Sequence, residues 1–446
     1  MLVHCRLGLR LPATGACVMN YCKTRILYAS LAALLIGVVT VPVRAADMPV
    51  KTAGESAPQG PQPMAIGGWL FSPTLFAGAV YNSNVNQTEA GKISSWGERV
   101  VPGFTANVDN GIYQTNIYGI ADLQNYSASG VNHQTTVDAK AGITQLYMPL
   151  PDLTVRGNFD FTRQADVFGS SAFTNANTTL SPTSAAPVAP VTVSPQVNPD
   201  RYNQYSGAVG VDKRFGRAFA GLSGSVIATK FDSDPGFATS RDGTVYTVAS
   251  RFGFDLTPQI YAYVDPQVDW QRYTDSARNS NGYRVTGGIG TSAPGLWQGE
   301  VYGGYQAEKN DIVGTYDSGV FGIRVGYSPT RMWDLKASLD ETLGASSIAT
   351  GGATGLATRV TTALLTVGYN GLPRGWGANG RFGYVRTSFV NVSRTDNGWL
   401  AGANVTYEVW RNLGLTLDYQ YKSVDSDVVG QSFDQHLVSL GASYKY

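Results

Sequence analysis

The sequence Leu-Gly-Leu-Thr-Leu-Asp-Tyr-Gln-Tyr-Lys, residues 413–422, alternates strictly between apolar and polar or small side chains. Successive side chains of a β-strand point to opposite faces, so this segment would have one apolar and one polar face. The same alternation recurs in blocks of about ten residues, among them 260–271, 297–308 and 333–340. Helical periodicity is nearly absent, and the chain is therefore predicted to be all-β.

Two architectures fit such alternation, and the connections distinguish them. A soluble β-sandwich or propeller would pack the apolar faces into a core, whereas an outer-membrane barrel would turn them toward lipid. Short turns are expected at 109–111, 150–153, 215–218, 257–259, 293–296, 328–331, 371–374 and 411–412, with longer polar stretches such as 82–98, 167–201 and 344–358 between them. Short periplasmic turns and long extracellular loops are typical of a transmembrane antiparallel outer-membrane β-barrel, here of about 18 strands, with 16 as the alternative.

Aromatic residues at the strand ends favour the barrel. Five tryptophans lie beside predicted short turns, namely Trp69, Trp297, Trp333, Trp376 and Trp410, and Trp96 and Trp399 lie near the opposite ends. Tryptophan rings favour the membrane–water interface, so these residues would form aromatic girdles. The amphipathic last strand, with Leu440, Tyr444 and the terminal Tyr446 on one face, resembles the signal that bacterial outer-membrane assembly machinery recognises.

The first 45 residues are predicted to be a signal peptide for Sec-type export, and the mature protein is expected in the outer membrane of a Gram-negative bacterium. Basic residues precede the apolar segment 26–41, and Val43-Arg44-Ala45 fits a cleavage site. The alternative is a single transmembrane anchor, for which the apolar segment is short. Residues 46–68, with four prolines, are expected to be a flexible periplasmic lead-in, and 69–446 the barrel.

Composition excludes several classes of function. All three cysteines lie within the first 22 residues, so the remaining chain has no disulfide framework and no cysteine metal site. It carries a slight excess of acidic residues, which argues against a nucleic-acid partner. Only His133 and His436 remain, and neither lies in a nucleophile motif such as Gly-x-Ser-x-Gly. The protein is therefore not expected to be an enzyme or to carry a metal or cofactor.

The polar face of the predicted strands should line a wet lumen, since a barrel of this width is too wide for side chains to fill. Both signs of charge occur on this face, and acids and bases are expected to pair across strands. The pore-lining candidates are Arg251, Tyr261, Tyr263, Asp265, Asp269, Arg284, Glu300, Tyr302, Arg324 and Arg381. The tyrosines would either stack on sugar rings or pack within the lumen beneath folded-in loops, and packing is the favoured alternative.

Two local features carry further expectations. Pro266 lies within a predicted strand and has no N–H to donate, so a bulge or a break in the ladder is expected there. The uncharged loop 167–199 is expected to be a solvated surface loop, and the alternative is a constriction that folds into the lumen.

Residues 69–85 contain Pro73 and the run Tyr-Asn-Ser-Asn-Val at 81–85, and Val101-Pro102 opens the next predicted strand. This pattern resembles the putative β-barrel porin 2 family, and the barrel plan covers 69–446. The resemblance implies an outer-membrane barrel. Some family members are channels for exopolysaccharide export that work with a periplasmic polysaccharide-export protein. It implies no individual binding residue.

We therefore expect a porin-like channel for passive passage of small hydrophilic solutes. The more specific expectation is that the channel exports saccharide or exopolysaccharide. The alternative is a structural or adhesive barrel with an occluded lumen. Membrane lipid and the barrel assembly machinery are the expected partners.

Overall fold

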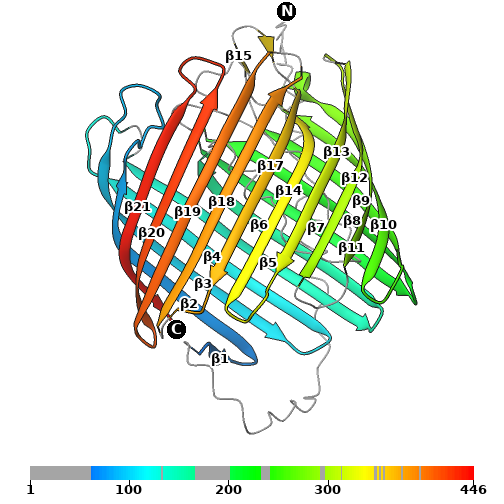
Figure 1. Ribbon diagram of the computed structural model, residues 1–446, viewed down its shortest axis with the longest axis horizontal. Helices are drawn as coiled ribbons and strands as arrows, with labels where there is room; N and C mark the ends of the chain where they lie inside the picture. Colours follow the sequence, from blue (N-terminus) through cyan, green and yellow to red (C-terminus); the bar gives the residue numbers. More distant parts are fainter. Residues whose placement is uncertain are drawn as a thin grey trace, which may run out of the picture. The chain divides into compact units, whose positions relative to one another are not determined.

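The computed structural model describes residues 62–131, 134–165, 201–232, 242–291, 297–312, 314–345, 349–350, 353–354, 357–372, 375–390 and 393–446. Within them, eighteen long antiparallel strands form one closed barrel (Figure 1). Closure is made by β2 and β21, the first and last of these strands, which pair from Thr74↔Lys445 to Asn82↔Leu437. The predicted fold and the count of 18 are confirmed.

The strands follow one another around the barrel in chain order. They are β2 (Trp69–Asn82), β3 (Ser95–Asp109), β4 (Tyr113–Tyr126), β5 (Thr135–Leu150), β6 (Leu153–Ala165), β7 (Arg201–Phe215), β8 (Ala218–Phe231), β9 (Gly243–Asp255), β10 (Ile260–Tyr273), β11 (Ser280–Thr291), β12 (Trp297–Asn310), β13 (Gly314–Tyr327), β14 (Trp333–Ala345), β17 (Ala357–Tyr369), β18 (Trp376–Phe389), β19 (Thr395–Trp410), β20 (Leu413–Ser426) and β21 (Phe433–Lys445). The shortest has 12 residues and the longest 16, which exceeds the 9–11 or so that a tilted strand needs to cross a bilayer.

Short elements lie outside this set. β1 (Met64–Ile66) pairs with the start of β2 through Gly67 and Gly68, whose φ angles of +55° and +89° fit a tight hairpin turn. The flexible lead-in predicted for 46–68 was therefore wrong at its end, because two consecutive glycines allow the chain to turn back and pair. β15 (Ala349–Thr350) and β16 (Ala353–Thr354) form a small hairpin, and η1 (Ser276–Arg278) is one turn of 3-10 helix. No described helix is long and apolar enough to cross a membrane.

The two ends of the barrel differ as predicted. The predicted short turns that lie within the described residues join strands at one end, which also carries the C-terminus (Figure 1). Trp69, Trp297, Trp333, Trp376 and Trp410 are the first or last residues of their strands there. Three of these indole rings pair with a tyrosine on the neighbouring strand, at 3.9 Å for Trp297–Tyr327, 4.4 Å for Trp333–Tyr369 and 4.7 Å for Trp376–Tyr407. An aromatic belt thus marks the short-turn end.

At the long-loop end, the loop 83–94 packs against the inside of the wall. Its Val85 and Ile93 contact a buried cluster of Val80, Tyr126 and Val131. Asn84 is fully buried and donates to the Asp434 carbonyl at 3.0 Å. Loop 167–199, which was considered as a constriction, lies outside the described residues, as do the signal peptide and His133.

Pro266 interrupts the β9–β10 ladder, as predicted. Pairing stops between Val264↔Phe252 and Gln267↔Ala249, while β11 pairs with β10 without a gap. The register is the same on both sides of the gap, so this is a break and not a bulge. The missing N–H of proline explains why the break falls on one side only.

Candidate functional site

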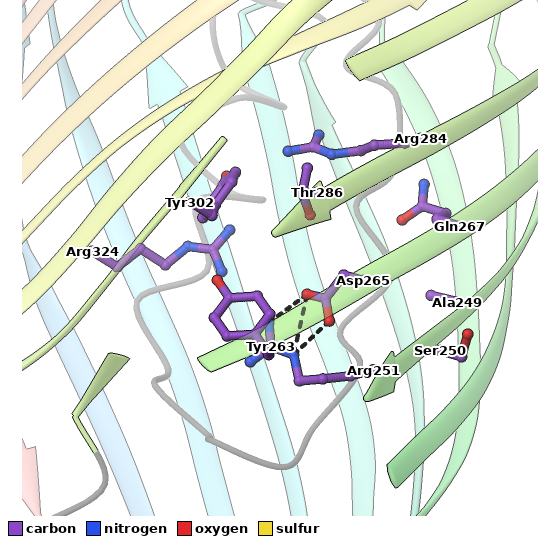
Figure 2. Close-up of a pocket in the computed structure, with 10 residues that line it drawn as sticks. All are labelled: Ala249, Ser250, Arg251, Tyr263, Asp265, Gln267, Arg284, Thr286, Tyr302 and Arg324. Atoms are coloured by element: carbon purple, nitrogen blue, oxygen red, sulfur yellow. Dashed lines mark hydrogen bonds and ion pairs between the residues drawn. The ribbon is translucent and has the colours of Figure 1, made fainter. Parts of the chain in front are cut away.

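The inner wall of β9 to β13 holds most of the predicted pore-lining residues. Arg251, Tyr263, Asp265, Arg284, Tyr302 and Arg324 line one pocket, together with Ala249, Ser250, Gln267 and Thr286 (Figure 2). Its empty volume is about 400 Å³, part of which is continuous with solvent. The pocket lies beside the break at Pro266, where the ladder between β9 and β10 is open.

Two arginines and three acids form an ion network in this wall. Arg251 binds Asp265 with two hydrogen bonds, of 2.8 Å from Nε and 2.6 Å from Nη2, which Figure 2 marks with dashed lines. Its Nη1 donates to Glu300 at 3.4 Å, and Arg324 donates to the other oxygen of Glu300 at 2.9 Å. Arg324 also donates to Asp340 at 3.0 Å. Glu300, only 4% exposed, thus bridges the two arginines.

Tyrosine rings lie flat against this wall because glycines stand opposite them. Tyr261 pairs with Gly290, Tyr263 with Gly288 and Tyr302 with Gly322 in the strand register. A Cβ atom on any of these glycines would lie 2.3–2.8 Å from the tyrosine opposite. The three side chains are only 1%, 6% and 7% exposed. Their faces are therefore covered, as in the packing alternative, and are not open platforms for sugar rings.

Cation–π contacts join the arginines of the ion network to the buried tyrosines. The Arg251 guanidinium lies 4.0 Å from the centre of the Tyr263 ring, and Arg324 lies 5.4 Å from that of Tyr302. Such contacts add to the ion pairs, and more so where the groups are buried. Tyr261 lies next to these contacts, where its hydroxyl donates to Glu300 at 3.3 Å.

Asp269 belongs to a different cluster, nearer the long-loop end. Its carboxylate accepts a hydrogen bond from Gln271 at 3.3 Å, and the same amide nitrogen donates to Glu308 at 3.4 Å. Ser280 and Gln306 also donate to Glu308, at 3.2 Å and 3.4 Å. Asp269 stands two strand positions beyond Gln267, which places it outside the pocket that Asp265 lines.

Arg381 stands apart from the other candidates. It lies on β18, its side chain is exposed, and it extends across Gly402 of β19, where a Cβ would meet Arg381 Nε at 2.8 Å. Its neighbour Phe382 points to the opposite face and is 46% exposed there. Arg381 therefore belongs to an inner wall that is lined differently from that of β9–β13.

Pairing of acids and bases across strands is confirmed elsewhere on the inner face. Arg99 binds Asp122 at 2.6 Å, Arg156 lies 3.4 Å from Asp212, and Arg214 lies 3.0 Å from Asp255. Glu308 and Asp340 lie on the polar faces of the alternating segments 297–308 and 333–340, but they are not among the pore-lining candidates. Their own strands do not indicate that they join these clusters, because Glu308 also bonds Gln271 of β10 and Ser280 of β11, and Asp340 bonds Arg324 of β13. The described residues contain no group of His, Cys, Asp and Glu arranged to hold a metal ion.

Comparison with known proteins gives a family and several similar structures. The model of the putative β-barrel porin 2 family matches residues 57–446. No curated protein sequence matches the chain. Among solved structures, the chain is similar to OpdK of Pseudomonas aeruginosa bound to vanillate, at 10% identity over 84% of this chain and 99% of that one, with a TM-score of 0.41. It is also similar to OccK9 (OpdG) of the same organism, at 12% identity over 84% and 98% of the chains, with a TM-score of 0.41.

Proposed function

The chain belongs to the putative β-barrel porin 2 family of outer-membrane barrels, and from this premise we propose that it is a passive channel for small hydrophilic solutes. Solutes would diffuse through the lumen, and the width of the passage and the charges along it would set which of them pass. Lipid demands that strand N–H and C=O groups be paired within the protein, and closure of the barrel leaves no free edge strand.

The inner wall of β18, β19 and β20 is the observation that carries this proposal. Over the short-turn half of these strands, the inward positions hold small or uncharged polar side chains beside the exposed Arg381 and a few other charged residues, and include Asn379, Gly402, Asn404, Thr416, Asp418 and Gln420. Nearer the long-loop end, the inward Val385, Leu400 and Val424 are buried. An eighteen-stranded barrel is too wide for such side chains to fill. The width and the polarity of this wall together support a hydrated passage.

Planar-bilayer recording of the refolded protein tests the channel. Stepwise increases in current are expected when single barrels insert, with a linear current–voltage relation at low voltage. Folding is checked separately by the shift in gel mobility that a folded barrel shows before heating. A folded, inserted protein that passes no current contradicts the channel and favours the structural or adhesive barrel with an occluded lumen.

Saccharide or exopolysaccharide passage, with a periplasmic polysaccharide-export protein as partner, is a refinement that rests on the family resemblance. The covered tyrosines at 261, 263 and 302 do not add to it. Gene deletion followed by measurement of surface polysaccharide tests this refinement. A deletion strain with undiminished surface polysaccharide contradicts it.

We also propose that the last strand is the signal for assembly into the membrane after Sec-type export. Leu440, Tyr444 and Tyr446 are exposed on the outer face. The Tyr446 N–H donates to the Pro73 carbonyl at 3.2 Å, so the terminal residue also lies at the seam between β21 and β2. Removal of Tyr446 should lower the amount of folded barrel in cells several-fold while the purified variant still refolds in detergent. Equal amounts in cells contradict the proposal.

A further inference from the structure

The pocket on the inner wall holds a third arginine that the ion network does not use. Asp265, Glu300 and Asp340 are the acids of that network, and each accepts hydrogen bonds from Arg251 or Arg324. Arg284, on β11, is only 3% exposed. Among the described residues it has no ion pair and no hydrogen bond, and its Nη1 atom is buried without a partner.

The Arg284 guanidinium is directed across the pocket. Figure 2 shows it reaching from β11 toward Tyr302, and its central carbon lies 5.6 Å from the centre of that ring. Burial of a cation that makes no ion pair is costly, since the charge loses its hydration and a carboxylate beyond contact distance offsets only part of that loss. A ring face offsets only a small part of that cost. The arrangement therefore needs an explanation other than packing.

Two more buried donors without partners belong to the same pocket. They are the Nε atom of Arg324 and the hydroxyl of Tyr263. Both residues line the pocket together with Arg284. Buried donors normally find an acceptor, because an unsatisfied polar group carries a large penalty. Apart from the Tyr263 hydroxyl, which can also accept, no lining side chain has a buried acceptor oxygen without a partner, so the unmet capacity of this pocket consists mainly of donors.

We propose that this pocket binds an oxyanion, the carboxylate, sulfate or phosphate group of a small solute, with Arg284 as its main contact. Guanidinium groups present forked N–H donors that match the paired oxygens of such groups. Arg324 Nε and the Tyr263 hydroxyl supply further donors. Gln267 and Thr286 also line the pocket, and their neutral polar groups can contact the rest of the solute.

This inference names the solute class of the proposed channel and rests on that function. An oxyanion group would be held on one wall while the passage beside β18–β20 stays open. Loss of the Arg284 charge should make the lumen less favourable to anions. Binding can be measured without any current, which separates the site from the channel.

The test is calorimetric titration of the refolded barrel in uncharged detergent with sodium sulfate, phosphate and acetate, and with chloride for comparison. At least one oxyanion should bind the wild-type protein. Arg284→Gln should weaken that binding about tenfold or more, because a charge-assisted contact is lost. Tyr263→Phe, which keeps the ring on Gly288, should weaken it several-fold. Arg381→Gln removes the same charge from a different part of the lumen and should change the affinity less than twofold.

A structural role for Arg284 is separated by a stability measurement. In buffer without oxyanions, Arg284→Gln should be at least as resistant to urea as the wild type, since it removes an unpaired buried charge. Marked destabilisation would instead mean that Arg284 holds the wall together, and would overturn the proposal. Equal affinities in Arg284→Gln and wild type, absence of oxyanion binding, or chloride bound as tightly as every oxyanion would also overturn it.

The bilayer experiment gives a separate readout. If the wild type conducts, the reversal potential of Arg284→Gln should be shifted from the wild-type value toward cation selectivity. The shift in Arg381→Gln should be much smaller. Currents without oxyanion binding would overturn the site and leave the channel standing. Oxyanion binding by a folded, silent barrel would overturn the channel and leave the site standing.

Discussion

The inner wall of β9–β13 is packed and that of β18–β20 is more open, although the strands of both follow the same alternation of polar and apolar side chains. In the first, the inward positions hold arginines, acids and tyrosines that bind one another and are buried. In the short-turn half of the second, the inward positions hold small and polar side chains beside Arg381, whose side chain is exposed. Strand periodicity assigns both sets to the same face. Only the contacts across strands determine that one wall is packed and the other stays open to water.

The largest expected effect comes from the acid that joins the packed wall together. Glu300→Gln leaves Arg251 and Arg324 without their shared counter-charge, and breaking a buried ion pair costs about 3–5 kcal/mol. The free energy of unfolding in urea, followed by gel mobility, should fall by about that amount. Glu408→Gln, at an exposed position of β19, is the control and should change it by less than about 0.5 kcal/mol. Equal decreases in the free energy of unfolding for Glu300→Gln and Glu408→Gln would contradict the difference in packing between the two walls.

A smaller effect is expected from the glycine beneath Tyr263. A Cβ at position 288 would lie 2.5 Å from the Val301 carbonyl oxygen and 2.8 Å from the tyrosine ring. Gly288→Ala should therefore lower the free energy of unfolding by about 1–3 kcal/mol, as overpacking does. Gly287→Ala faces the other way, its nearest contact would be at 3.5 Å, and it should be nearly neutral. A neutral Gly288→Ala would show that the ring is not held against the wall.

The smallest expected effect lies outside both walls and depends on pH. Arg163 donates to Asp232, just beyond β8, and this hydrogen bond lowers the pKa of that carboxyl below its ordinary value of about 3.9. A lowered pKa in the folded state stabilises the barrel above pH 4 and ceases to do so as the pH falls through the folded pKa. Because the pair is partly exposed, Asp232→Asn should cost under about 1 kcal/mol at pH 7. The difference from wild type should vanish as the pH falls through the lowered pKa of the folded state; a difference that persists once Asp232 is protonated contradicts this origin.

The barrel could be predicted from the sequence because the patterns that specify it are local. Alternation assigns each side chain to a face, and the short turns give the strand count, so neither depends on distant partners. The pocket depends on register between strands. Tyr263 meets Gly288 and Glu300 meets Arg251 only after the turn lengths and the tilt of the barrel are fixed. Asp269 shows the limit of the method, since it shares the face and charge of Asp265 but lies in another cluster.

The tetrapeptide Asn-Ser-Asn-Val at 82–85 shows a second limit. It carried the family resemblance, and it was expected to lie in a polar loop. In the structure, Gln435 donates to the side chain of Asn82 at 3.0 Å and to the carbonyl of Asn84 at 2.9 Å. The motif therefore anchors a folded loop to the seam between β2 and β21. Alternation cannot reveal such an anchor, because the residues that bind it lie some 350 positions away in the chain.

The claim that solutes pass beside the open wall is tested most directly by chemical modification of introduced cysteines. Residues 46–446 contain no cysteine, so Arg381→Cys and Phe382→Cys each supply a single thiol on opposite faces of β18. A bulky, water-soluble thiosulfonate reagent should lower the single-channel current of Arg381→Cys and leave that of Phe382→Cys unchanged. Mass spectrometry verifies attachment in both. Full attachment at position 381 without any change in current would contradict the passage.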